Sequence, residues 1–162
     1  MAVTTQESTE YANLSASPPV IQNKQVLGGK VEIVMVTHDQ SGVGDAGSSV
    51  AIARLPAGRV RLLGALSNLY INWTASSQTL DAGWDAYTDF SGAAVVADPD
   101  GLDDGLDVDT VGSFALGSVA AVLAVGSTKV FESQSGVVLR LTAVGALADG
   151  DDVAGFIAYI AD

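Results

Sequence analysis

The groups with most potential for chemistry lie in the acidic segment "ADPDGLDDGLDVDT", residues 97–110. It holds six aspartates in fourteen residues and no basic residue. Carboxylate oxygens are the ligands that Ca²⁺ prefers in proteins, so the first hypothesis is a calcium loop.

The spacing of the aspartates does not support that hypothesis. An EF-hand loop requires acidic or amide side chains at positions 1, 3 and 5, glycine at 6 and glutamate at 12. In a loop that begins at Asp98, position 5 is Leu102, and no other starting point satisfies the pattern. A solvated acidic loop between strands is the simpler interpretation, and we predict no metal and no cofactor. A looser ion site stays open, formed by Asp100, Asp103 and Asp107.

Few residues are suited to catalysis. The chain has no cysteine and one histidine, His38. A serine–histidine–aspartate triad would use His38 as base, but Asp39 follows it directly and would point to the opposite face of a strand. The segment "GVGDAG", residues 42–47, satisfies a dinucleotide-binding pattern, yet a strand-like segment follows it instead of the helix that would hold the pyrophosphate. We predict no catalytic residues and a protein that is not an enzyme.

The net charge excludes further classes of partner. Nineteen acidic residues and seven Lys+Arg give a formal charge of -12, which repels phosphate backbones and anionic lipids. We therefore predict no direct nucleic-acid binding and no membrane association. The longest apolar run, residues 114–125, has twelve residues and is too short to span a bilayer. The first fifteen residues lack the basic and apolar regions of a secretion signal, so none is expected.

From Gln25 onward, short β-type segments alternate with turn residues about every ten positions, which is typical of an all-β sandwich or barrel. We predict one β domain over residues 25–162. A helix is expected only within residues 114–125. The clearest predicted strands are residues 30–39, residues 49–55, and residues 59–73 with a bend at Gly64.

Residues 1–24 form a different kind of segment, rich in Ser, Thr, Gln, Glu and Asn and without a hydrophobic period. The Pro18–Pro19 pair favours extended geometry and excludes a helix interior. We predict an extended N-terminal arm that either frays as many termini do or orders on a partner. Its expected partner-binding anchors are Tyr11, Leu14, Pro18, Pro19, Val20 and Ile21.

Four segments carry a resemblance to a known family: "GDAGSSVAIARLPAGRVRLLG", "LDAGWDAYTD", "DGLDDGLDVDTVGSF" and "VFESQSGVVLRLTA". Together they resemble small virion structural proteins of tailed bacteriophages, and within that group the capsid decoration (cement) proteins. The resemblance covers residues 44–162 and leaves the arm uncovered.

The resemblance implies a jelly-roll-like β-sandwich that forms a homo-oligomer, with a trimer favoured, on the outer capsid surface of the virion. Its partner would be the major capsid protein, whose neighbouring subunits it would clamp to stabilise the head. Two alternatives stay open: another virion component, such as a head-tail or tail-fibre β-domain, and a calcium- or carbohydrate-binding β-sandwich module. The second would use Trp73, Trp84 and Tyr87 as a sugar-stacking patch, although burial in the core is the simpler interpretation of these aromatics.

Overall fold

The structure, a computed structural model, describes residues 30–73 and 78–161. Two short helices, η1 (Gly64–Leu66) and α3 (Ala120–Leu123), stand among the strands. The strands are β1 (Val31–Asp39), β2 (Ser49–Leu55), β3 (Gly58–Leu63), β4 (Asn68–Asn72), β5 (Thr79–Trp84), β6 (Tyr87–Thr88), β7 (Ala94–Val95), β8 (Asp98–Asp107), β9 (Gly112–Ala115), β10 (Thr128–Ser133), β11 (Val137–Ala143) and β12 (Asp152–Ala161). The predicted all-β class is confirmed. The predicted arm, residues 1–24, lies outside the described residues.

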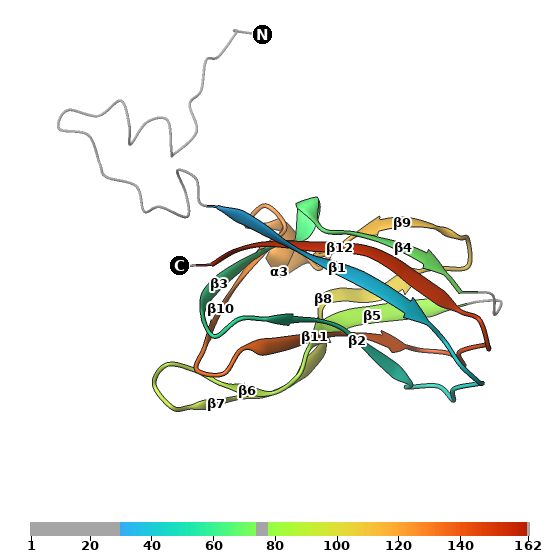
Figure 1. Cartoon of the computed structure of the whole chain (residues 1–162), viewed down its shortest axis with the longest axis horizontal. Coiled ribbons are helices and arrows are strands. Elements are labelled where there is room, and N and C mark those ends of the chain that lie inside the picture. Colours follow the sequence, from blue (N-terminus) through green and yellow to red (C-terminus); the bar gives the residue numbers. More distant parts are fainter. Residues whose placement is uncertain (1–29, 74–77, 162) are drawn as a thin grey trace, which may run out of the picture. The chain divides into compact units, whose positions relative to one another are not determined.

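The strands form two antiparallel sheets and the small β6–β7 hairpin (Figure 1). In the first sheet, β1 pairs with one edge of β12 along its length, and both β3 and β4 pair with the other edge. β3 and β4 are therefore two halves of one interrupted strand, and β10 and β9 pair with these halves in turn. The second sheet has the order β2-β11-β5-β8.

When each interrupted strand is treated as one, both sheets have four strands, and the eight strands can be numbered along the chain. The first sheet then has the order 1-8-3-6 and the second 2-7-4-5. A chain that passes back and forth between two four-stranded sheets in this order forms a jelly roll. The predicted jelly-roll-like β-sandwich is therefore confirmed. At one corner Gly44 and Leu147 exchange backbone hydrogen bonds, which keeps the β1–β2 ribbon paired with β11–β12 as both pass between sheets.

The core lies between the two sheets and follows the two-residue period of the strands. β11 shows this most clearly, because its residues alternate strictly between buried and half-buried positions. The largest fully buried side chains are Phe131, Leu55, Leu62, Leu69, Ile71, Leu80, Leu102, Leu139, Leu141 and Ile157.

The predicted bend at Gly64 is confirmed, and it is where the strand between β2 and β5 is interrupted. A β-carbon at Gly64 would overlap the carbonyl oxygen of Leu116, so only glycine fits there. The Ser67 hydroxyl bonds to backbone groups at the interruption. It donates to the Leu63 carbonyl and accepts from the Ala158 amide, both at 3.0 Å. The break therefore leaves few backbone groups unsatisfied.

The predicted helix within residues 114–125 is present only as one turn, α3, while Phe114 belongs to β9. Gly117 and Gly126 adopt positive φ angles of 86° and 74° on either side of α3, which limits the helix to this length. In the described part of the chain, no helix has the length and apolar character needed to cross a bilayer.

Candidate functional site

The acidic segment forms an edge strand and not a loop, which corrects the sequence-based expectation. Residues 98–107 are β8, the outer strand of the second sheet, and its register against β5 shifts twice. Leu102 is buried and anchors the strand to the core. Gly83 permits the pairing, since a β-carbon there would overlap the carbonyl oxygen of Asp98. Turn-like composition was therefore overridden by one buried leucine and by glycines that allow close backbone approach.

Asp103, one of the candidate ion ligands, is fully buried and serves the fold. Its carboxylate accepts hydrogen bonds from the backbone amides of Gly117, at 2.9 Å, and Ser118, at 2.7 Å. Asp107 accepts from the amide of Asp109 at 3.0 Å. Among residues 30–73 and 78–161, no three histidine, aspartate or glutamate side chains gather closely enough to hold a metal ion. The carboxylates of Asp103 and Asp107 thus accept hydrogen bonds from backbone amides of the same chain.

The start of β8 has a distinct electrostatic character. Burial raises the pKa of Asp98, and a hydrogen bond and the charge of Asp100 raise it further, while the nearby Lys129 charge opposes the shift. The Lys129 ammonium lies 4.4 Å from the centroid of the Trp84 ring, a cation–π contact. Asp98 therefore holds a proton more tightly than a free aspartate does.

The outer face of the second sheet carries a bidentate ion pair. The Arg140 Nε and Nη2 atoms donate to the two carboxylate oxygens of Asp85, each at 2.7 Å, and Nη1 donates to the Ser49 hydroxyl at 3.1 Å. The hydrogen bond to Arg140 lowers the pKa of Asp85. The pair links β11, the end of β5 and β2, and both partners are partly exposed, so its role is structural and modest in energy.

The three aromatic residues of the hypothetical sugar patch do not form an exposed platform. Trp73 and Trp84 are buried in the core. Trp84 and Tyr87 each meet Phe131 edge-on, at ring-centroid distances of 5.4 and 6.1 Å. The simpler interpretation, burial of Trp73 and Trp84 in the core, is confirmed, and these rings are not available to stack on a sugar.

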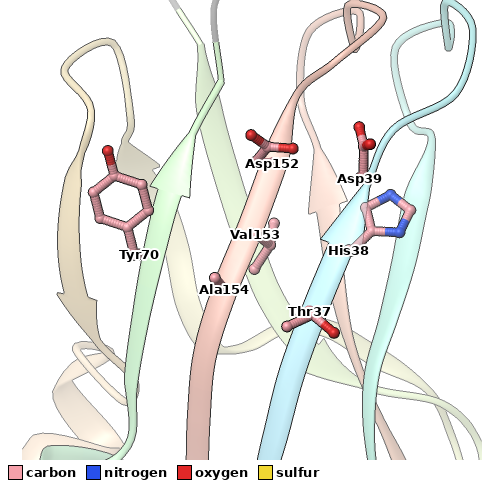
Figure 2. A pocket seen from close by; sticks show the side chains of 7 residues that line it. All are labelled: Thr37, His38, Asp39, Tyr70, Asp152, Val153 and Ala154. Atoms are coloured by element: carbon pink, nitrogen blue, oxygen red, sulfur yellow. The ribbon is translucent and has the colours of Figure 1, made fainter.

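His38 lines a shallow groove of about 380 Å³ on the first sheet, shown in Figure 2. The groove lies over the ends of β1, β12 and β4, where Asp39 and Asp152 are register partners and Tyr70 stands on the far side. His38 points away from Asp152 and Tyr70, and its Nε2 lies 3.2 Å from Gln40 Oε1. The His38 ring thus contacts the side-chain amide of a loop residue, as expected of a polar residue at a strand end. The loop of residues 42–47 leads into β2, not into a helix.

The surface feature that sequence reasoning missed is an apolar face on the outside of the first sheet. Three side chains of β1 form what we call the β1 stripe: Val31, Ile33 and Met35, which are 45%, 59% and 71% exposed. Two residues on the adjacent strands β12 and β4 extend this apolar face across the sheet. Phe156 of β12 is the register partner of Met35, and Tyr70 of β4 is 45% exposed.

A signal for the β1 stripe was present in the sequence. "VEIVMV" carries large apolar residues in both phases of a strand: Val34 and Val36 in one, the β1 stripe in the other. In the structure Val36 is buried and Val34 packs against the core, so the second apolar set is left on the outer face. A strand that is apolar in both phases is either covered on both sides or carries a contact surface. The six predicted arm anchors lie outside the described residues.

No protein-family model matches the chain, and no curated protein matches its sequence. Solved structures do match its fold. A chain in the capsid asymmetric unit of cyanophage Pam1 is 14% identical with a TM-score of 0.53, and the match covers 83% of this chain and 87% of that one. This chain therefore shares its jelly roll with the cyanophage chain over most of both lengths.

Two further matches are more distant. A chain of the infectious bursal disease virus Gx strain is 15% identical with a TM-score of 0.48, over 80% of this chain and 32% of that one. A chain of the acid-stable capsid of Helicobacter pylori bacteriophage KHP30 is 13% identical with a TM-score of 0.37, over 81% of this chain and 93% of that one. Of these three matches, the cyanophage likeness, with a TM-score above 0.5, is the one that defines a shared fold.

Proposed function

We propose that this chain is a non-enzymatic structural protein of a virus particle, and within the particle a decoration (cement) protein. It binds the outer surface of a bacteriophage capsid and clamps neighbouring major capsid subunits, which stabilises the head. The observation that carries the proposal is the nearly full-length match to a chain of the cyanophage capsid asymmetric unit, 83% of this chain against 87% of that one. The resemblance of residues 44–162 to phage decoration proteins supports the same role.

The chemistry of the described residues supports binding through surfaces. The polar groups most suited to catalysis or ion binding are engaged locally: Asp103 with backbone amides, Asp85 with Arg140, and His38 with Gln40. The carbohydrate-binding alternative loses its basis, because its two tryptophans are buried. A head-tail or tail-fibre component could use the same fold, so its position within the particle is what separates it from a decoration protein.

The proposed contact with the shell combines three elements. The N-terminal arm supplies the anchors Tyr11, Leu14, Pro18, Pro19, Val20 and Ile21. The acidic surface, from a formal charge of -12, favours a basic patch on the major capsid protein. Homo-oligomerisation, with a trimer favoured, multiplies weak individual contacts into a stable attachment. Attachment should therefore weaken as ionic strength rises, because salt screens the charged part of the contact.

The direct test is the composition of purified particles. The 16.4 kDa chain should be present at a fixed ratio to the major capsid protein, and particles stripped of it should lose DNA at lower temperature until it is added back. Imaging of labelled protein should place it on the head. Particles that lack the chain would overturn the proposal, and a label confined to the tail would favour the alternative virion role.

The role of the arm has its own test. A variant without residues 1–24 should keep the thermal unfolding of the full chain but no longer bind stripped particles, with the full chain as control. Equal binding by both forms would remove the arm from the contact and leave the β domain as the binding element.

A further inference from the structure

We propose that the β1 stripe is the surface through which copies of this chain associate with one another, with the stripes of neighbouring copies meeting about a symmetry axis. This inference deepens the homo-oligomer of the proposed function and rests on that function only for its biological setting. Three observations carry it: the exposure of the stripe, the regular and proline-free edge of β1, and the charge of the rest of the chain.

The first observation is exposed apolar area concentrated on one strand. Single exposed apolar side chains are ordinary on protein surfaces, but contiguous ones mark contact sites. Val31, Ile33 and Met35 occupy successive outward positions of one strand, and all are at least 45% exposed. Phe156 and Tyr70 extend the same face across β12 and β4. The resulting surface resembles the apolar centre of an interface more than the rim of one.

The second observation is that β1 lacks two of the features that protect sheet edges, proline and irregular register. Edge strands commonly carry charges, proline or irregular register, which prevent pairing with another chain. β1 pairs with β12 in unbroken register over nine residues, no proline lies within it, and its two carboxylates, Glu32 and Asp39, lie outside the stripe. Among the described residues, no strand pairs with its other edge. The stripe therefore lies at an open edge, where a second copy can reach it.

The third observation is the charge of the chain, which indicates what kind of partner covers the stripe. Residues near a symmetry axis meet their own copies, so a charged side chain there would face a like charge. In a chain of net charge -12, such like-charge contacts are mostly between carboxylates. The stripe avoids them, because its three residues are uncharged and Glu32 is in the opposite phase of β1, where it accepts a hydrogen bond from the Tyr159 hydroxyl at 3.0 Å. The carboxylate in the same phase, Asp39, lies two outward positions beyond Met35. A basic partner would instead be favoured by the acidic surfaces, so an uncharged face in this chain fits a second copy.

The test is the mass of the full chain in solution, measured by sedimentation equilibrium. The wild-type chain should form a closed oligomer of the 16.4 kDa unit. Met35→Glu should raise the dissociation constant by about 100-fold or more, because association would bury an unpaired carboxylate. Its matched control is Val96→Glu, which adds the same charge at a position 77% exposed on another part of the molecule. The control should associate like wild type.

A mixing experiment separates loss of contact from loss of fold. Met35→Lys should also be monomeric, but an equal mixture of the Met35→Glu and Met35→Lys chains should associate more strongly than either alone, since opposite charges would then meet at the axis. Recovery on mixing is expected only if position 35 of one copy lies near position 35 of another. Unchanged mass for both variants, or no recovery on mixing, would overturn the inference.

Other occupants give different results, each of which would overturn it. If the chain's own arm covers the stripe, the wild type is monomeric and removal of residues 1–24 promotes association. If the shell covers it, the wild type is monomeric and Met35→Glu loses particle binding. Failure of the proposed function is separate: the oligomer and its loss in Met35→Glu would persist even if no form of the chain bound particles.

Discussion

β1 and β8 are each the outer strand of a sheet, yet they present opposite chemistry to the solvent. β1 displays the uncharged β1 stripe in unbroken register with β12. β8 displays aspartates, contains Pro99, and shifts its register twice against β5. These three features of β8 are the ones that keep a sheet edge from pairing with another chain. The edge of β8 thus has all three features, whereas β1 has neither proline nor irregular register.

The difference changes the interpretation of the acidic segment. Its six aspartates first suggest an ion site, but two kinds of structural position stand out among them. Asp103 points inward and holds the backbone before α3. Asp104 and Asp107 are exposed along the edge. The segment is therefore a structural and protective element, while the strand with no conspicuous chemistry carries the proposed contact.

The largest expected effect on stability comes from removing the inward aspartate of β8. Asp103→Ala leaves two backbone amides without their acceptor in a buried site and should lower the free energy of unfolding by about 3 kcal/mol. Urea denaturation at neutral pH measures this. The neighbouring variant Asp104→Ala, at an exposed position, should change stability by less than about 0.5 kcal/mol. Similar losses in both variants would contradict the division of β8 into structural and protective aspartates.

The second prediction concerns substitutions that make the edge of β8 uncharged, as the β1 stripe is. Replacing the exposed pair, Asp104→Thr with Asp107→Thr, should leave the fold intact. It should lower by roughly tenfold the concentration at which light scattering reports association beyond the closed oligomer. Threonine keeps a hydroxyl acceptor for the Asp109 amide. Asp45→Lys, which changes the net charge equally at an exposed loop position, is the control. Association in the control as well would indicate an effect of net charge alone, not of the strand edge.

The smallest effect concerns Asp98 at the start of β8. Its pKa in the folded state is raised above the ordinary 3.8, so the folded chain binds this proton more tightly than the unfolded chain does. The charged carboxylate therefore destabilises the fold above its folded-state pKa, and that loss is recovered as pH falls through this pKa toward 3.8. Asp98→Asn should be more stable than wild type at pH 7 by up to about 0.5 kcal/mol, with no gain below pH 3.8.

Denaturation of Asp98→Asn and wild type across this pH range measures the difference directly. Asp45→Asn, which removes a charge from an exposed loop, shows how much comes from net charge. A gain that grew as the pH fell would have the opposite sign to the one expected from burial of Asp98.

Sequence patterns predicted the parts of the fold that depend on local chemistry. Short β-type segments marked β1 and β2. Gly64 marked the bend in residues 59–73, because a position that excludes a β-carbon is readable as glycine. Residues 98–107 were wrongly expected to be a loop, since their pairing depends on contacts with β5, which is distant in the chain. The burial of Asp103 likewise depends on residues fourteen and fifteen positions away.

By itself, the sequence determined the β class, the positions of strands such as β1 and β2, the absence of cysteine chemistry and the acidic charge. These follow from composition and from the two-residue period of strands, which are local properties. Only the tertiary structure decided which phase of each strand faces the core. "VEIVMV" is apolar in both phases, and its pairing with β12 turns Val34 and Val36 inward and leaves the β1 stripe outside. The choice between two apolar faces is made by packing against distant strands, so no local pattern contains it.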